Sequence, residues 1–309
     1  MTRIQFQNFW DGFPKHDNII TYALSQTRDV EVIEHPPFFK PSLSGAPLWV
    51  GDPDIIFRQG SGGMKDPNVI TISWLIESMD RIGSPNYDNC HYSLNSCNFD
   101  DDRNYRIPFW ATQINWNSAA TYDTQRGPTY FISLDKLFNR EINNRDRDCC
   151  SVASNPLGKR GDFYPKISQA IDVTHGGDFL RNTSEMVERP GNSDYLEKIE
   201  FISKFKSHLC FENDDTQGYV CEKILHAFYA GCLPIYWGPS NVVEDFNEKA
   251  FINVGDFESD DDAIAYIKDV LGSESKLEDY LSEPIFPEGK IPYHATPQSL
   301  EDFFKQIGL

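Results

Sequence analysis

Two residues of opposite charge, Glu222 and Lys223, stand near the start of "GYVCEKILHAFYAG", a segment with helical apolar spacing. The N–H groups of a helix's first turn have no partner within the helix, and they bind phosphate or carboxylate groups readily. A lysine in that turn adds a full charge, which contributes roughly 4 kcal/mol to an ion pair at about 4 Å and an effective dielectric constant near 20. Because the formal net charge of the chain is −19, a cation at this position indicates a local anion site.

Glu222 suits a different ligand group, since its carboxylate repels a phosphate but accepts hydrogen bonds from the two hydroxyls of a ribose. Adjacent helical residues diverge by about 100°, so Glu222 and Lys223 can contact neighbouring parts of one nucleotide. Gly218, just before the helix, permits a close approach of the backbone. The local pattern alone also allows a simpler explanation, in which both residues are solvated at a helix start and Glu222 is favoured by the helix dipole.

Short apolar runs alternate with amphipathic segments along the chain, a pattern typical of an α/β fold with parallel strands. In the first half we expect strands at residues 3–9, 30–35, 53–60 and 68–78, with a helix at 18–27. In the second half we expect strands at 149–156, 208–213, 233–238 and 250–257. The expected helices there are 162–171 (after its proline), 196–206, 219–231, 260–272 and 275–283.

The length of 309 residues is about twice that of a typical domain, which predicts two domains. Residues 97–150 are polar and weakly periodic, and we interpret them as the end of the first domain and the approach to a linker. The predicted domains are therefore 1–147 and 148–309, two Rossmann-like α/β domains facing a central cleft. Ligands of such sheets lie beyond the carboxyl ends of the strands, where the loop between residues 213 and 219 is expected.

Composition excludes several partners. The acidic balance disfavours a nucleic acid, because its backbone would be repelled. No run approaches the roughly 20 apolar residues of a membrane span, and we see no signal peptide. The seven cysteines form no CxxC pair, which argues against a zinc site and favours reduced thiols in a cytoplasmic protein. The C-terminal "PQSLEDFFKQIGL" is short and acidic, so we expect no strong membrane attachment.

The stretch "FENDDTQGYVCEKILHAFYAGCLPIYWG" closely resembles the donor-binding motif of the alpha-1,3-fucosyltransferases, glycosyltransferase family ten. Further resemblances are found in "VASNPLGKRGDFY", "GGDFLRNT" and "DFNEKAFINVGDF", and in the first half "SWLIES" and "YSLNSCNFDDDRNYRIPF". The resemblance covers roughly residues 70–285 and is strongest in the second half. Cys221 departs from the family's usual threonine, and acids fill the loop at Asp214 and Asp215.

The resemblance implies a GT-B architecture with GDP-fucose in the C-terminal domain and the acceptor on the N-terminal side. By motif position, Lys223 and Arg160 would contact the pyrophosphate of the donor. Glu222 and Tyr219 would hold the ribose and nearby groups, and Asn213 would contact the nucleotide-sugar. It also implies a bacterial-type member, or an enzyme of a microbe or virus, acting in the cytoplasm on a lactosamine-type or related glycan that contains N-acetylglucosamine.

The chemistry of the predicted reaction agrees with these residue types. Cleavage at fucose C1 leaves negative charge on the β-phosphate, which Arg160 and Lys223 can neutralise in place of a divalent metal. We therefore expect no required cofactor, with a divalent cation at most stimulatory, and no metal ligands in the acidic runs 100–102 and 260–262. Lys159 could exchange roles with Arg160, and Arg181 could lie behind the site.

A carboxylate on the first domain is expected to deprotonate the acceptor hydroxyl. Glu77 is the candidate, because it ends a buried strand and matches the family's Glu-Ser position, and Asp80 is the nearest rival. The predicted reaction is inverting transfer of L-fucose to the 3-hydroxyl of N-acetylglucosamine. The alternatives are a GT-B transferase with another guanine-sugar donor, and a non-catalytic protein that binds a sugar-nucleotide or a glycan.

Overall fold

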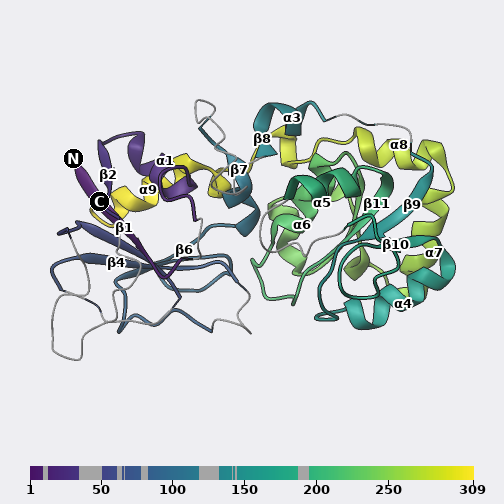
Figure 1. Cartoon of the computed structure of the whole chain (residues 1–309), viewed down its shortest axis with the longest axis horizontal. Helices are drawn as coiled ribbons and strands as arrows, with labels where there is room; N and C mark the ends of the chain where they lie inside the picture. The colour runs from purple at the N-terminus through teal and green to yellow at the C-terminus, as the bar shows by residue number, and fades with distance from the viewer. Residues whose placement is uncertain are drawn as a thin grey trace. The chain divides into compact units, whose positions relative to one another are not determined.

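The chain folds into two compact units, each with its own parallel sheet (Figure 1). The computed structural model describes residues 1–9, 13–34, 51–60, 65, 67–77, 83–117, 132–140, 142, 145–186 and 195–309. The N-terminal unit comprises Met1–Thr112 together with Tyr293–Leu309, and the C-terminal unit comprises Gln113–Pro292. The predicted domains, 1–147 and 148–309, differ from these units at the linker and at the C-terminus, where the chain returns to the first unit.

The N-terminal unit is built on a parallel sheet with strand order β2-β1-β3-β4-β5-β6. Its central strands are apolar and buried on both faces, as expected for parallel strands covered by other layers. The strands are β1 (Thr2–Gln7), β2 (Val30–Val32), β3 (Ile55–Gln59), β4 (Ile70–Leu75), β5 (Tyr92–Asn95) and β6 (Asn104–Arg106), and the helices α1 (Ile19–Ser25) and α9 (Pro297–Gln306).

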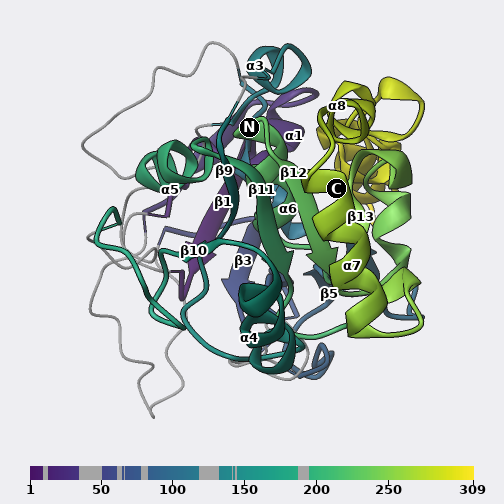
Figure 2. The ribbon, with the colours of Figure 1, turned by 90° about the vertical axis from the view of Figure 1, so that its right-hand side faces the viewer.

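The C-terminal unit contains a second parallel sheet, with strand order β10-β9-β11-β12-β13 (Figure 2). Its strands are β9 (Arg147–Ser151), β10 (Val173–His175), β11 (Phe205–Phe211), β12 (Leu233–Trp237) and β13 (Ile252–Asn253). Its helices are α3 (Leu134–Phe138), α4 (Arg160–Ala170), α5 (Tyr195–Ile202), α6 (Glu222–Tyr229), α7 (Asp260–Leu271) and α8 (Glu274–Ser282), and a separate pair is formed by β7 (Ile114–Asn115) and β8 (Ile132–Ser133). Two Rossmann-like units with parallel sheets confirm the predicted fold class.

Several elements differ from the sequence-based expectation. Helix α4 begins at Arg160 rather than after Pro165. The proline removes one helical hydrogen bond, but the buried side chains of Phe163 and Ile167 pack this helix into the core. The strand expected at residues 250–257 is limited to β13, because the chain turns into a 3₁₀ helix at Val254–Asp256. None of the helices within the described ranges is both long and apolar enough to cross a membrane.

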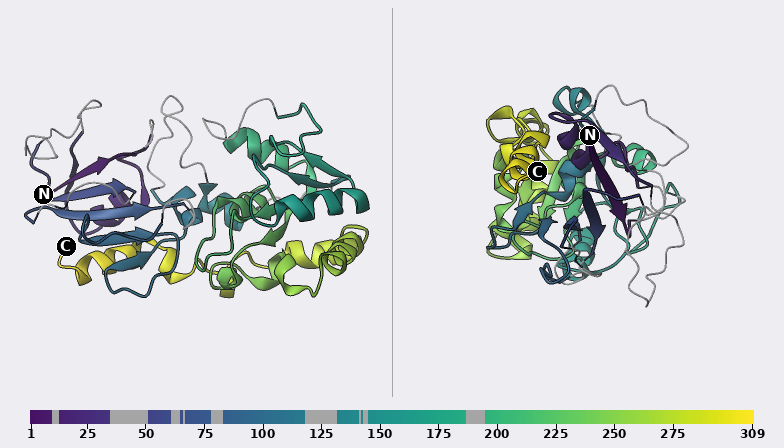
Figure 3. Two further views of the ribbon diagram at one scale, coloured as in Figure 1. Left: turned by 90° about the horizontal axis from the view of Figure 1, so that it is seen from below. Right: turned by 90° about the vertical axis from the view of Figure 1, so that its left-hand side faces the viewer.

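The C-terminal helix α9 packs in the N-terminal unit beside α1 (Figure 3). The Phe304 ring lies 6.1 Å from the ring of Phe57 on β3, and the Phe303 ring lies 5.1 Å from that of Tyr105 on β6. The Tyr105 hydroxyl donates to Ser299 Oγ at 2.6 Å. These apolar contacts explain why a segment that is distant in sequence belongs to the first unit.

Candidate active site

The candidate donor site lies at the carboxyl edge of the C-terminal sheet, between β9 and β11. From β9 the chain continues to β10 on one side, and it then returns to form β11 on the other side of β9. This reversal of strand order is a topological switch point, where open α/β sheets bind ligands. The loops that leave these two strands lead to Arg160, at the start of α4, and to Glu212 and Asn213, directly after β11.

Arg160 joins the two loops through a buried guanidinium group, with 2% of the residue exposed. Its Nη2 donates to the Phe211 carbonyl at 2.6 Å and to Asn213 Oδ1 at 2.9 Å, and its Nε also donates to the Phe211 carbonyl, at 3.2 Å. Its Nη1 donates to Asn155 Oδ1 at 3.0 Å. The structure therefore brings Arg160 and Asn213 together, and Arg160 holds the two loops to each other. The contacts of both residues with a donor stay a prediction.

Lys223 pairs with Glu212, a residue whose role the sequence reasoning missed. Glu212 is 0% exposed; its Oε2 accepts from Lys223 Nζ at 2.8 Å, and its Oε1 accepts from the Cys221 amide at 2.7 Å. We expected the amides at the helix start to be open to an anion, but the Cys221 amide already donates to this carboxylate. Helix α6 begins at Glu222, so Lys223 does lie in its first turn. An acid that directly follows the buried run "HLCF" was the available signal for Glu212.

The charges around Lys223 keep it protonated. Burial acts to lower the pKa of Lys223, but the negative groups around it outweigh burial, and the pKa is raised above its usual value. Burial raises the pKa of the Cys221 thiol well above its ordinary value, so at neutral pH the effective anions are Glu212 and Glu222. The charge of Arg160 opposes the protonation of Lys223. The two predicted pyrophosphate ligands thus lie within electrostatic range of each other.

Glu222 and Tyr219 occupy different environments. The carboxylate of Glu222 lies 3.7 Å from Lys198 Nζ and its side chain is 13% exposed. Burial acts to raise the pKa of Glu222, but the charges of Lys223 and Lys198 lower it to about 2. Tyr219 is 2% exposed and makes a side-chain hydrogen bond with Cys221, so in this arrangement it supports the loop. Its contact with ribose stays a prediction.

Glycines allow the loops to approach one another closely. Gly158 has φ +61°, and a Cβ there would lie 2.8 Å from the Glu212 carbonyl oxygen and 2.9 Å from that of Asn213. Gly218, which precedes Tyr219, has φ +90° and donates its amide to Asn241 Oδ1 at 2.9 Å. A side chain at Gly158 would displace the loop that carries Asn213, and one at Gly218 would strain the backbone, because φ there is positive.

The other two cationic candidates point to nearby acids. Lys159, at the N-cap of α4, lies 2.7 Å from Asp260 at the start of α7. The second acidic run, 260–262, is a helix N-terminus, as expected, and the ion pair of Asp260 with Lys159 was not predicted. Arg181 lies 3.9 Å from Asp178 and donates to the Met186 carbonyl at 2.8 Å.

Glu77 lies two residues beyond β4 in the N-terminal unit and is partly buried. The prediction placed Glu77 at the end of this strand, but the strand ends two residues earlier, so Glu77 follows its carboxyl end. Its role as the base stays a prediction. The rival base, Asp80, falls outside the described residues.

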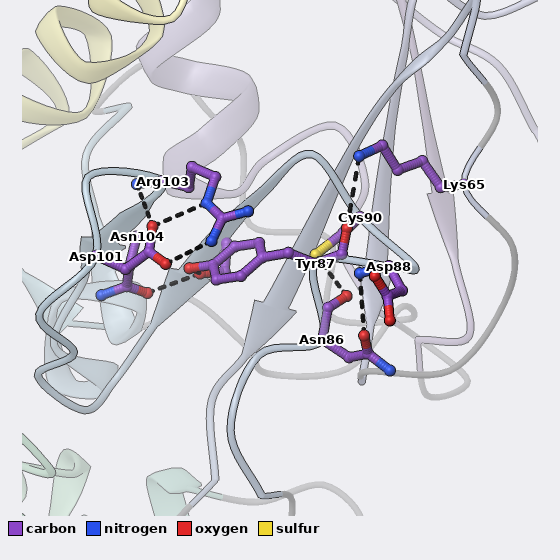
Figure 4. A network of polar contacts seen from close by, with 9 residues as sticks. Lys65, Asn86, Tyr87, Asp88, Cys90, Asp101, Arg103 and Asn104 are labelled. Atoms are coloured by element: carbon purple, nitrogen blue, oxygen red, sulfur yellow. Dashed lines mark hydrogen bonds and ion pairs between the residues drawn. The ribbon is translucent and has the colours of Figure 1, made fainter.

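The first acidic run, 100–102, lies in a turn of the N-terminal unit (Figure 4). Asp101 forms a two-point ion pair with Arg103, at 2.7 and 2.9 Å, and hydrogen bonds from Arg103 lower the pKa of Asp101 to about 2. The Arg103 guanidinium lies 3.7 Å from the centroid of the Tyr87 ring. Within the described ranges, no cluster of three His, Cys, Asp or Glu side chains is suited to a metal ion.

Comparison with known proteins connects this geometry to a family. Residues 142–282 match the model described as glycosyltransferase family 10 (fucosyltransferase) C-term. The chain is 29% identical to the alpha-(1,3)-fucosyltransferase FucT of Helicobacter pylori over 290 residues, 86% of this chain and 56% of that protein. It is 33% identical to the putative fucosyltransferase R654 of Acanthamoeba polyphaga mimivirus over 123 residues, 40% of this chain and 20% of that protein. The chain thus spans about half the length of the Helicobacter relative.

Solved structures agree over nearly the whole chain. A crystal structure of an alpha1,3-fucosyltransferase with GDP-fucose superposes with a TM-score of 0.70 at 26% identity, covering 99% of this chain and 90% of that chain. The structure titled with GDP gives a TM-score of 0.69 at 27% identity, covering 99% and 89%. The fold is the GT-B fold of these structures. More particularly, residues 142–282 are similar to the C-terminal part of glycosyltransferase family 10, the fucosyltransferase family.

Proposed function

We propose that this chain transfers L-fucose from GDP-β-L-fucose to the 3-hydroxyl of an N-acetylglucosamine in a lactosamine-type glycan. The observation that supports this best is the cluster of Arg160, Asn213, Glu222 and Lys223 at the switch point of the C-terminal sheet. Two cations within electrostatic range of each other suit a diphosphate, and an ionised carboxylate near Lys223 suits a ribose diol. One structurally similar alpha1,3-fucosyltransferase is described with GDP-fucose.

The proposed chemistry uses the charges of this cluster. When the bond between fucose C1 and the β-phosphate oxygen breaks, negative charge develops on the leaving GDP. Arg160 and Lys223 would stabilise that charge, which is the largest catalytic effect in many transferases. We therefore propose that no divalent cation is required and that one at most stimulates the reaction; assays with and without a chelator test this.

Glu77 is the proposed general base in the N-terminal unit. It would accept the proton of the acceptor hydroxyl as that oxygen attacks C1 from the face opposite GDP, so that a β-linked donor yields an α-linked product. General-base assistance of this kind contributes roughly 10²- to 10⁴-fold in rate. The position of Glu77 after a buried strand supports this role.

The proposal is tested by incubating the purified protein with GDP-fucose and an acceptor array, with the linkage determined by NMR. The Glu77→Gln variant should bind GDP within about twofold of the unmodified protein but lose roughly 10²- to 10⁴-fold in transfer. Glu31→Gln, which changes an exposed acid on β2, is the matched control and should retain transfer. Turnover that survives Glu77→Gln would contradict the assignment of the base.

The same assay separates the alternatives. A panel of guanine-sugar donors distinguishes a fucosyltransferase from a GT-B enzyme with another donor. A protein that binds GDP and glycan but shows no turnover with any donor would be a binding protein. A cytoplasmic location without strong membrane attachment also stays a proposal; it agrees with the seven cysteines, which are all buried and form no disulfide in the structure.

A further inference from the structure

Lys198, on α5, is a buried lysine outside the donor-binding motif. Only 3% of the residue is exposed, and lysine is among the side chains least often buried without a partner. Its ammonium lies 3.7 Å from Glu222 Oε1. Within the described residues, Glu222 is the acidic side chain that pairs with it.

The neighbouring titratable groups leave Glu222 as the main counter-charge. Burial lowers the pKa of His208 to about 3 and that of His226 well below its usual value, so both imidazoles are neutral at neutral pH. Glu212 also attracts Lys198, though more weakly than Glu222 does, but its two oxygens already accept from Lys223 and the Cys221 amide. Lys198 and Glu222 therefore form a second buried ion pair behind the motif.

The two buried ion pairs hold different residues of the donor-binding motif. Glu212 fixes Lys223 from the end of β11, whereas Lys198 reaches Glu222 from a different helix, α5. An ionised carboxylate can accept hydrogen bonds at both oxygens, whereas a protonated one donates through one of them. Recognition of a diol thus depends on Glu222 remaining charged and correctly oriented.

We propose that Lys198 is a positioning residue for donor recognition, which holds Glu222 ionised and oriented so that its carboxylate accepts hydrogen bonds from both ribose hydroxyls. This inference rests on the proposed function, in which Glu222 contacts the ribose of GDP-fucose. Its specific consequence is that Lys198 controls discrimination between nucleotides with and without ribose hydroxyls, although it does not touch the ligand itself.

The test compares the affinities of GDP and 2′,3′-dideoxy-GDP by calorimetry. Two hydrogen bonds to a charged group correspond to a preference for GDP on the order of 10²-fold in the unmodified protein. Lys198→Met keeps the buried stem but removes the charge, and should reduce this preference to roughly fivefold or less. Lys198→Arg restores a cation and should recover most of the preference. Lys204→Met, which removes an exposed lysine just after α5, is the matched control and should leave the preference unchanged.

The outcomes separate this inference from the proposed function. If Glu222→Gln abolishes the preference for GDP while folded Lys198→Met retains it, Lys198 is not a positioning residue but the function still stands. If the unmodified protein binds GDP and dideoxy-GDP equally, or binds neither, the ribose contact and the inference are both wrong. A uniform loss of affinity for both nucleotides in Lys198→Met, with the ratio preserved, would indicate a purely structural role and would also overturn the inference.

Discussion

Replacing Glu212 by glutamine perturbs the anchor of the donor-binding motif with little change in shape. The carboxylate is fully buried and accepts hydrogen bonds from Lys223 at 2.8 Å and from the Cys221 amide at 2.7 Å. Glutamine offers one carbonyl oxygen, and its NH₂ group would face one of these two donors. The Lys223 ammonium would then lose its closest negative partner.

The magnitude of this change follows from burial. Removing one partner of a buried ion pair typically costs about 3–5 kcal/mol, because the other charge stays desolvated. The Lys223 side chain is 19% exposed, so partial hydration places the expected loss near the lower limit, about 3 kcal/mol. If the C-terminal unit unfolds cooperatively, a loss of this free energy lowers its Tm by roughly 6–12 °C.

A double-mutant cycle measures the pair itself. Glu212→Gln, Lys223→Met and the double variant are compared by urea unfolding at neutral pH, with GDP binding followed by calorimetry. The double variant should lose at least about 1.5 kcal/mol less than the sum of the single variants, because it leaves no unpaired buried charge. Asp148→Asn, which breaks the partly exposed pair with Lys206, is the control and should shift Tm by no more than about 3 °C.

Additive effects in this cycle would refute the reasoning, since two residues that hold each other must show coupling. Equal stability of Glu212→Gln and the unmodified protein would also refute the reasoning, because it would show that the Lys223 ammonium needs no buried partner. In either case, the start of α6 would be held by contacts other than this carboxylate.

Two further predictions concern stability and loop geometry. Burial lowers the pKa of His208 in the folded protein to about 3, from 6.5 in the unfolded chain. The neutral, buried imidazole therefore contributes its full stability above about pH 6.5. As the pH falls from 6.5 toward 3, the free energy of unfolding should fall by about 1.4 kcal/mol per pH unit on account of this residue. Urea unfolding at a series of pH values should show that the free energy of unfolding of His208→Gln depends less steeply on pH than that of the unmodified protein. An equal slope for the two proteins would contradict this. Gly158→Ala should destabilise the protein by about 1–3 kcal/mol and weaken GDP binding, because its Cβ meets the Glu212 and Asn213 carbonyls. Gly308→Ala, also at positive φ but with open space around it, is the control, and equal effects of the two on GDP binding would show that the close loop contact is unimportant.

The alternation of strands and helices was predictable because each element shows its own local periodicity of apolar residues. The apolar run that forms β4 and the acidic start of α7 could be recognised from a few consecutive residues. Short elements were not predictable in this way. Strands β5, β6 and β10 have three or four residues each, too few to show a period, and they are stabilised by the strands beside them.

The candidate site was predictable to the extent that strand ends and helix starts mark it. Glu222 and Lys223 were candidates from the local pattern, whereas Arg160 and Asn213 were candidates only through the family resemblance; the structure joins Arg160 and Asn213 by a hydrogen bond of 2.9 Å. The partners of the charged motif residues were not predictable, because Glu212 and Lys198 are identified by burial and distance rather than by spacing. Sequence position gave no sign that a lysine on α5 would lie beside Glu222.

The sequence by itself determined two parallel α/β units, the motif at the start of α6 and the chemistry that such residue types allow. Tertiary structure alone decided which groups are paired, and that α9 packs on the first unit through Phe303 and Phe304. The physical reason is the distance along the chain over which each effect acts. Periodicity and capping act over a few residues, whereas burial of an ion pair or of an aromatic ring depends on segments brought together only when the whole chain folds.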